Sequence, residues 1–145
     1  MARINSRVKG RAGERELIGE LKRLLPGALT DNLERNLTQT RNGGHDILGL
    51  DGWAVEVKRY AEFTPADMVN CWQQTVTQAR NERARPALCY RADRREWRVV
   101  LSAVDVMDEE DYLFEWDAAD YMYTMDMSLP MFARIVVEMA NVQES

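Results

Sequence analysis

The sequence predicts an α/β domain in which helices flank a mixed β-sheet. Two segments with helical periodicity, at residues 12–25 and from residue 64 onward, alternate with short runs rich in β-forming residues. The order along the chain is helix, three strands, helix and two strands, which is typical of a mixed sheet with helices packed on it. The chain has 145 residues, 46% of them hydrophobic, and can therefore bury one core.

The first part of the chain predicts a helix followed by a strand. Leu17, Leu21 and Leu24 recur at helical spacing, and Pro26 ends the run, so we expect a helix over 12–25. Residues 1–11 are polar and basic, and we expect them to form a flexible arm. A strand is expected around 33–40, followed by a loop at 41–44.

The next segment predicts a β-hairpin, because β-rich runs at 45–50 and 53–58 flank Asp51 and Gly52. Two registers are open. A two-residue turn would pair Asp46 with Val57 and point the Asp46 side chain into the core. A three-residue loop with Gly52 in the left-handed conformation would place Asp46 opposite Glu56.

The second half of the chain predicts a capped helix and two further strands. Thr64, Pro65 and Asp67 form the start of a helix with a capping box. Strands are expected at 87–91 and 96–101, and another helix is expected to start at 128–130. We expect a core domain over 1–103 and an acidic, aromatic extension over 104–145 that packs on this core or on a second subunit.

Composition excludes several classes of protein. No apolar stretch is long enough to span a membrane, and the first residues do not resemble a signal peptide. One histidine and two scattered cysteines cannot build a structural zinc site, nor the centre of a nuclease that needs several histidines. We therefore expect a cytoplasmic protein whose Cys71 and Cys89 are reduced and buried.

Charge is distributed unevenly along the chain. The net charge is -5, yet residues 1–103 hold 18 Lys and Arg against 13 Asp and Glu, whereas residues 104–145 hold one basic residue against 11 acids. A basic body is compatible with binding of phosphate groups on one face. A solvated acidic surface with chance clustering explains the same numbers equally well.

Three acidic residues and one lysine form the candidate site. Glu56 and Lys58 share one face of their strand, which suits either a catalytic pair or a surface salt-bridge ladder. If Asp46 lies opposite Glu56, the two carboxylates are about 5 Å apart and repel unless a cation such as Mg2+ lies between them. Glu14 extends the buried stripe of the first helix, although a glutamate in a first turn also suits the helix dipole.

These residues resemble the motifs of the PD-(D/E)XK nuclease superfamily. The matching segments are Lys9-Gly10, 14–17, Asp46-Ile47 and 56–58, and the spacing over residues 7–101 is most similar to small archaeal-type Holliday junction resolvases and related phage endonucleases. The resemblance implies a restriction-endonuclease-like fold over the first 103 residues. It also implies a metal-dependent DNA endonuclease that is selective for branched DNA and acts as a homodimer.

The resemblance also assigns roles to residues. Asp46, Glu56 and the Val57 carbonyl would bind Mg2+ or Mn2+, with Glu14 completing the acidic cluster directly or through water. Lys58 would position or deprotonate the attacking water and stabilise the developing charge. DNA contacts are expected from Lys9, Arg11, Arg41, His45, Arg59 and Gln74, although Gln74 also fits a solvated helix face.

Two departures from the family pattern concern the substrate more than the chemistry. The loop before Asp46 lacks the serine of the archaeal enzymes, and the acidic segment after residue 103 has no counterpart that we can match. The alternatives are a nuclease for flap, duplex or single-stranded DNA, or an inactive nucleic-acid-binding protein that has kept the fold. The presence of all four candidate residues favours activity.

Overall fold

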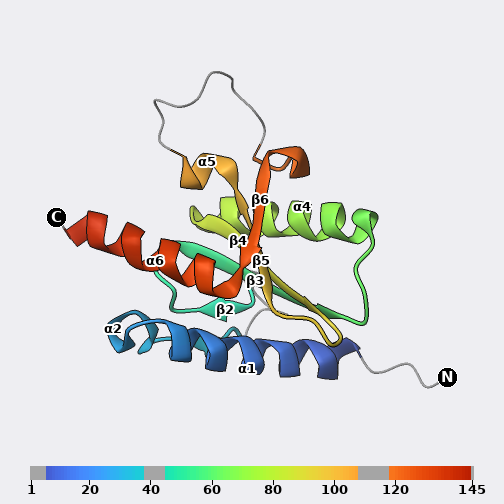
Figure 1. The fold of residues 1–145 in the computed structure, drawn as a ribbon, viewed down its shortest axis with the longest axis horizontal. Helices are drawn as coiled ribbons and strands as arrows, with labels where there is room; N and C mark the ends of the chain where they lie inside the picture. The colour runs from blue at the N-terminus through green and yellow to red at the C-terminus, as the bar shows by residue number, and fades with distance from the viewer. Residues whose placement is uncertain (1–5, 38–44, 108–117, 145) are drawn as a thin grey trace.

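The computed structural model describes residues 6–37, 45–107 and 118–144, and within them a six-stranded sheet lies between helices (Figure 1). The strands, in the order in which they lie across the sheet, are β1 (Glu34–Arg35), β2 (Ile47–Leu48), β3 (Trp53–Tyr60), β4 (Arg85–Ala92), β5 (Arg98–Ser102) and β6 (Thr124–Ser128). The long helices are α1 (Ser6–Leu24), α4 (Pro65–Glu82) and α6 (Leu129–Glu144). The short helical segments are α2 (Gly27–Thr30), α5 (Ala103–Val106) and the 3-10 turn η2 (Tyr121–Tyr123).

The sheet is mixed because β3 and β4 are parallel and every other neighbouring pair is antiparallel. Helix α4 makes the crossover that two parallel strands require. It begins with the expected capping box, in which Thr64 Oγ1 accepts the Asp67 N–H at 3.1 Å and Asp67 Oδ2 accepts the Thr64 N–H at 2.9 Å. The predicted α/β fold, a mixed sheet flanked by helices, is confirmed.

The helices divide between the two faces of the sheet (Figure 1). Leu17 and Leu21 of α1 and Phe132 of α6 pack with Val55 and the other inward residues of one face. The opposite face packs against α4, and its core is smaller. Because side chains alternate along a strand, Glu56 and Lys58 lie on the α4 face, and their neighbour Val57 lies on the α1 face.

The register of the β2–β3 hairpin is the one that brings two acids together. Ile47 pairs with Val55, and Gly52 has a φ of +84°, as a three-residue loop with a left-handed glycine requires. The alternative two-residue turn is therefore wrong. A second glycine, Gly49, has a φ of +95°, and a Cβ atom added there would lie 2.0 Å from a main-chain oxygen. Glycine is required at that position because a side chain would collide with the backbone.

Several boundaries differ from the sequence-based prediction. Helix α1 starts at residue 6, so residues 6–11 belong to a helix and not to the flexible arm that we expected. The strand expected at 33–40 is only two residues long, and residues 38–40 lie outside the described part of the chain. Strand β6 was not predicted at all, because it follows an acidic and aromatic segment with no clear alternation.

The C-terminal residues contribute to the same sheet and the same core. Strand β6 pairs with β5, and α6 packs on the face that α1 covers. The division of the chain at residue 103 stays a prediction. Cys71 and Cys89 are buried and free, as expected. In the described ranges, no helix is both long enough and apolar enough to cross a membrane.

Candidate active site

Asp46 immediately precedes β2 and is held at the edge of β3 by backbone contacts. Its main-chain N–H donates to the Val55 carbonyl at 2.9 Å, and its carbonyl accepts the Asn36 N–H at 2.9 Å. Its side chain is buried, and Oδ2 accepts the Val57 N–H at 2.7 Å. The Asp46 carboxylate therefore takes the place of a strand residue that would otherwise bond to Val57.

Glu56 lies on β3 opposite Asp46, and its side chain is 5% exposed. Its Oε1 atom is buried and has no hydrogen-bond partner among the described residues. Burial, and then the negative charge of Asp46 and a hydrogen bond between the two carboxyl groups, raise the pKa of Glu56 to about 9. Glu56 therefore keeps its proton at neutral pH unless a cation compensates its charge.

Glu14 of α1 lies close enough to the pair to interact with it electrostatically, but it has a partner of its own. Its Oε2 accepts a hydrogen bond from Arg35 Nε of β1 at 2.7 Å, and both side chains are largely buried. Burial raises the pKa of Glu14, the Arg35 hydrogen bond lowers it, and the charge of Asp46 raises it. Within residues 6–37, 45–107 and 118–144, no three His, Cys, Asp or Glu side chains are arranged to hold one ion.

Lys58 follows Glu56 on the same face of β3 and is half-buried. Its ammonium group has no hydrogen bond or ion pair with any described residue, and its charge acts to lower the pKa of Glu56. The N–H and C=O groups of one strand residue point to the same side, so the Val57 carbonyl lies at the β3 edge that Asp46 occupies. The structure thus brings together Asp46, Glu56, Lys58 and the Val57 carbonyl.

The residues expected to contact DNA are scattered. Arg11 on α1 and Gln74 on α4 are exposed, as a contact with DNA requires. Arg59 lies on the opposite face of β3 from Lys58, against Gly13, and its guanidinium group bonds to Asp93 Oδ1 at 2.5 Å. The side chain of Lys9 and the whole of Arg41 lie outside the described part of the structure.

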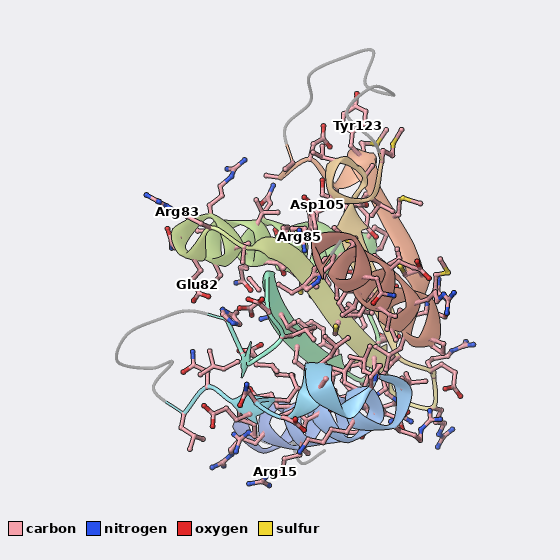
Figure 2. All side chains as sticks on the ribbon, turned by 90° about the vertical axis from the view of Figure 1, so that its left-hand side faces the viewer. Arg15, Glu82, Arg83, Arg85, Asp105 and Tyr123 are labelled. Atoms are coloured by element: carbon pink, nitrogen blue, oxygen red, sulfur yellow. The ribbon has the colours of Figure 1, made fainter. Side chains whose placement is uncertain are left out.

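His45 is buried next to Asp46. Its Nδ1 atom lies against the carboxylate of Glu82, at the C-terminal end of α4, and Glu82 Oε1 accepts the His45 main-chain N–H at 3.3 Å. The His45 carbonyl accepts a hydrogen bond from Asn36 Nδ2 at 2.9 Å. Figure 2 shows this end of α4, with Glu82 labelled. The imidazole is therefore positioned by protein groups, which suits a role in holding Asp46 better than a direct phosphate contact.

Sequence reasoning missed three residues that support the site, namely Arg35, Asn36 and Glu82. Arg35 binds Glu14, Asn36 anchors the segment before β2, and Glu82 fixes His45. Each acts on a residue between 9 and 37 positions away in the chain, so no local pattern could reveal it. The one available signal was the charge of Arg35 within the strand predicted at 33–40.

Comparison with known families decides what kind of protein carries this site. The profile of the family described as "Phage putative PDDEXK endonuclease" matches residues 5–144. The chain belongs to this family. This membership confirms the resemblance seen in the sequence, and the mixed sheet flanked by helices is the restriction-endonuclease-like architecture that the resemblance implies. The chain is accordingly a nuclease of the PD-(D/E)XK superfamily.

Among solved structures, the chain is similar to Hjc, a Holliday junction resolvase from the archaeal hyperthermophile Archaeoglobus fulgidus. The two share 21% sequence identity with a TM-score of 0.48, and the match covers 85% of this chain and 97% of the other. A comparison with curated proteins found no match.

The carboxyl pair of this PDDEXK nuclease fits a divalent metal ion. Mg2+ prefers oxygen ligands and is commonly held by one or two carboxylates, with waters and substrate phosphate completing its shell. Asp46, Glu56 and the Val57 carbonyl offer such oxygens at one strand edge, and Glu56 Oε1 has no hydrogen-bond partner in the part of the chain that the structure describes. Mg2+ and Mn2+ do not require three protein carboxylates, so the ligand set of Asp46, Glu56 and the Val57 carbonyl is compatible with either ion.

Proposed function

We propose that this nuclease is a divalent-metal-dependent DNA endonuclease that hydrolyses phosphodiester bonds at the Asp46–Glu56 pair. The observation that carries the proposal is the pair itself. Its two buried carboxyl groups are in contact with each other, and Glu56 Oε1 has no hydrogen-bond partner among the described residues. Burying two acids together is costly, and it persists in proteins mainly where a cation or a proton compensates. A free lysine beside the pair has no structural partner among the described residues, which favours a role toward substrate.

The residues divide the chemistry among them. Asp46, Glu56 and the Val57 carbonyl would hold the ion, and Glu14 would contribute through water because Arg35 occupies its carboxylate. When bound, the ion supplies Lewis acidity toward the phosphate and makes water a better nucleophile. Lys58 donates hydrogen bonds to the phosphate oxygens and stabilises the charge that develops on them. The main-chain contacts of Asp46 fix its carboxylate before substrate binds.

For the substrate we propose branched DNA, supported by the resemblance of the motif spacing to junction resolvases. Two symmetric cuts would require two sites, which a homodimer provides through two-fold symmetry. Light scattering coupled to gel filtration measures the oligomeric state directly, and a monomer at assay concentrations would contradict the homodimer.

We also propose that the protein is located in the cytoplasm.

The decisive experiment compares the wild type with Glu56→Gln on end-labelled junction, flap, duplex and single-stranded DNA. Glu138→Gln, which changes an exposed carboxylate on α6, serves as the matched control. We expect the wild type and Glu138→Gln to cleave in Mg2+ or Mn2+, with no cleavage in EDTA and none by Glu56→Gln. Cleavage that persists in EDTA, or in Glu56→Gln, would refute the proposed site. The preferred DNA identifies the substrate.

A further inference from the structure

Three aromatic side chains lie near Lys58, beside it on β4 and beyond it at the end of β3. Tyr60, Phe63 and Tyr90, here called the aromatic patch, contact one another in a chain. The rings of Tyr60 and Phe63 stack with centroids 4.5 Å apart and planes inclined by 20°, and Phe63 meets Tyr90 edge to face at 5.0 Å. Nothing in the catalytic assignment uses these residues.

The aromatic patch is on the same face of the sheet as the catalytic lysine. Lys58 and Tyr60 are alternate residues of β3, so their side chains project from the same face about 6.7 Å apart along the strand. Tyr90 of β4 is in register with Lys58 and lies about 4.8 Å to its side. Consecutive phosphates of an extended DNA strand are separated by a distance similar to that between Lys58 and Tyr60 along β3. A phosphate at Lys58 therefore places the neighbouring base within reach of the patch.

The outer member of the patch presents its ring and not its hydroxyl group. Tyr60 is 36% exposed, while one face of its ring is covered by Phe63. Its hydroxyl lies 3.7 Å from Cys71 Sγ on α4, and the Tyr90 hydroxyl donates to Asp126. Because its hydroxyl and one face of its ring contact protein groups, we infer that the exposed part of Tyr60, which a ligand would meet, is the other face of the ring.

The charges around the patch indicate how a nucleic acid would lie. Lys58 is a cation without a partner among the described residues, and Glu62, in the loop that follows Tyr60, is exposed. A phosphate backbone is attracted to the lysine and repelled by the glutamate. The backbone is thus expected to stay on the Lys58 side, with only an uncharged base extending to Tyr60.

We propose, resting on the DNA endonuclease function above, that Tyr60 stacks on an unpaired base next to the scissile phosphate. Aromatic rings bind bases of any sequence by stacking, but a base inside a duplex is already stacked on its neighbours. The site therefore selects DNA that exposes an unstacked nucleotide at the cleavage position, such as a junction or a bulge, over continuous duplex. Phe63, which Tyr90 contacts from its other side, holds the Tyr60 ring in place.

The test compares cleavage of a duplex carrying one unpaired adenine with cleavage of the same duplex fully paired. Tyr60→Leu keeps an apolar side chain but loses the planar ring, and Tyr60→Phe keeps the ring. We expect the bulge-to-duplex ratio of kcat/KM to fall by about 5- to 100-fold in Tyr60→Leu. The ratio should stay near the wild-type value in Tyr60→Phe. Tyr123→Leu changes an exposed tyrosine at the far edge of the sheet (Figure 2) and should also retain it.

A binding measurement separates stacking from catalysis. With 2-aminopurine as the unpaired base and EDTA present, we expect its fluorescence to be quenched by wild type and Tyr60→Phe, and not by Tyr60→Leu. An unchanged ratio and unchanged quenching in Tyr60→Leu would overturn the inference and leave the endonuclease proposal intact. If the wild type neither binds nor cleaves either DNA, the proposed function fails and this inference fails with it.

Discussion

The pH dependence of unfolding tests the carboxyl pair without any substrate. Glu56 has a pKa of about 9 in the folded protein, raised by burial first and then by Asp46, and it regains the ordinary value of 4.5 on unfolding. Between these two values the unfolded chain has lost a proton that the folded chain retains. The free energy of unfolding therefore falls as pH rises through this window, by at most about 1.4 kcal/mol per pH unit.

Glu56→Gln keeps the shape of the protonated side chain and removes its ionisation. We expect the variant and the wild type to have similar stabilities near pH 4.5. At pH 7 the variant should be more stable by about 1–3 kcal/mol, because much of the titration window has then been crossed. At this chain length the difference corresponds to about 3–10 °C in Tm.

The assay is thermal or urea unfolding followed by circular dichroism at several pH values in EDTA. Glu138→Gln is the control, because its carboxylate is 56% exposed in a surface pair with Arg134. If the wild-type and Glu56→Gln curves run parallel from pH 4.5 to 9, the reasoning about the buried pair is refuted. At pH 7, added Mg2+ should raise the Tm of the wild type by mass action and leave that of Glu56→Gln nearly unchanged.

Three further substitutions test individual residues. Lys58→Ala should reduce cleavage by at least about 10²-fold while DNA binding, measured by anisotropy, stays nearly intact; wild-type rates would contradict the assigned role. Arg35→Ala leaves the Glu14 carboxylate without its partner, and we expect the free energy of unfolding in urea to fall by about 1–3 kcal/mol. An unchanged urea midpoint would show that the pair does not contribute to stability. Gly49→Ala should lower the free energy of unfolding by at least about 2 kcal/mol, because Gly49 has a positive φ and an added Cβ would collide with the backbone. Gly19→Ala, in open space on helix α1, should stabilise the protein slightly. Equal effects of the two substitutions would refute the collision.

Much of the fold was predictable because its signals are local. The capping box at Thr64 and Asp67 acts within four residues and is found as expected. Gly52 adopts the left-handed conformation that one of the two open hairpin registers required. The Asp46–Glu56 contact followed from the hairpin register, which the turn determines. The central pair of the candidate site was thus one of two arrangements that the sequence allowed, and the observed register selects it.

The remaining features depend on contacts that the sequence pattern does not encode. Strand β6 has one buried residue, Met127, and its position is determined by pairing with β5, whose partner residues are 22 to 30 positions away in the chain. The first turns of α1 lack apolar periodicity, so residues 6–11 could not be distinguished from a flexible arm. Arg35 reaches Glu14 only because β1 lies beside α1, which no periodicity shows.

The short length of β2 has a consequence for the solubility of the protein. Among the described residues, β2 pairs with β3 only as far as Val55, so the edge of β3 from Val57 onward has no strand partner. An open edge of this kind is a template for pairing with another chain, and proteins protect such edges with charges. Asp46 provides that protection by occupying the Val57 N–H with its own carboxylate. Losing Asp46 would therefore remove a ligand of the proposed metal site and also leave the Val57 N–H open at an edge where copies of the protein can aggregate.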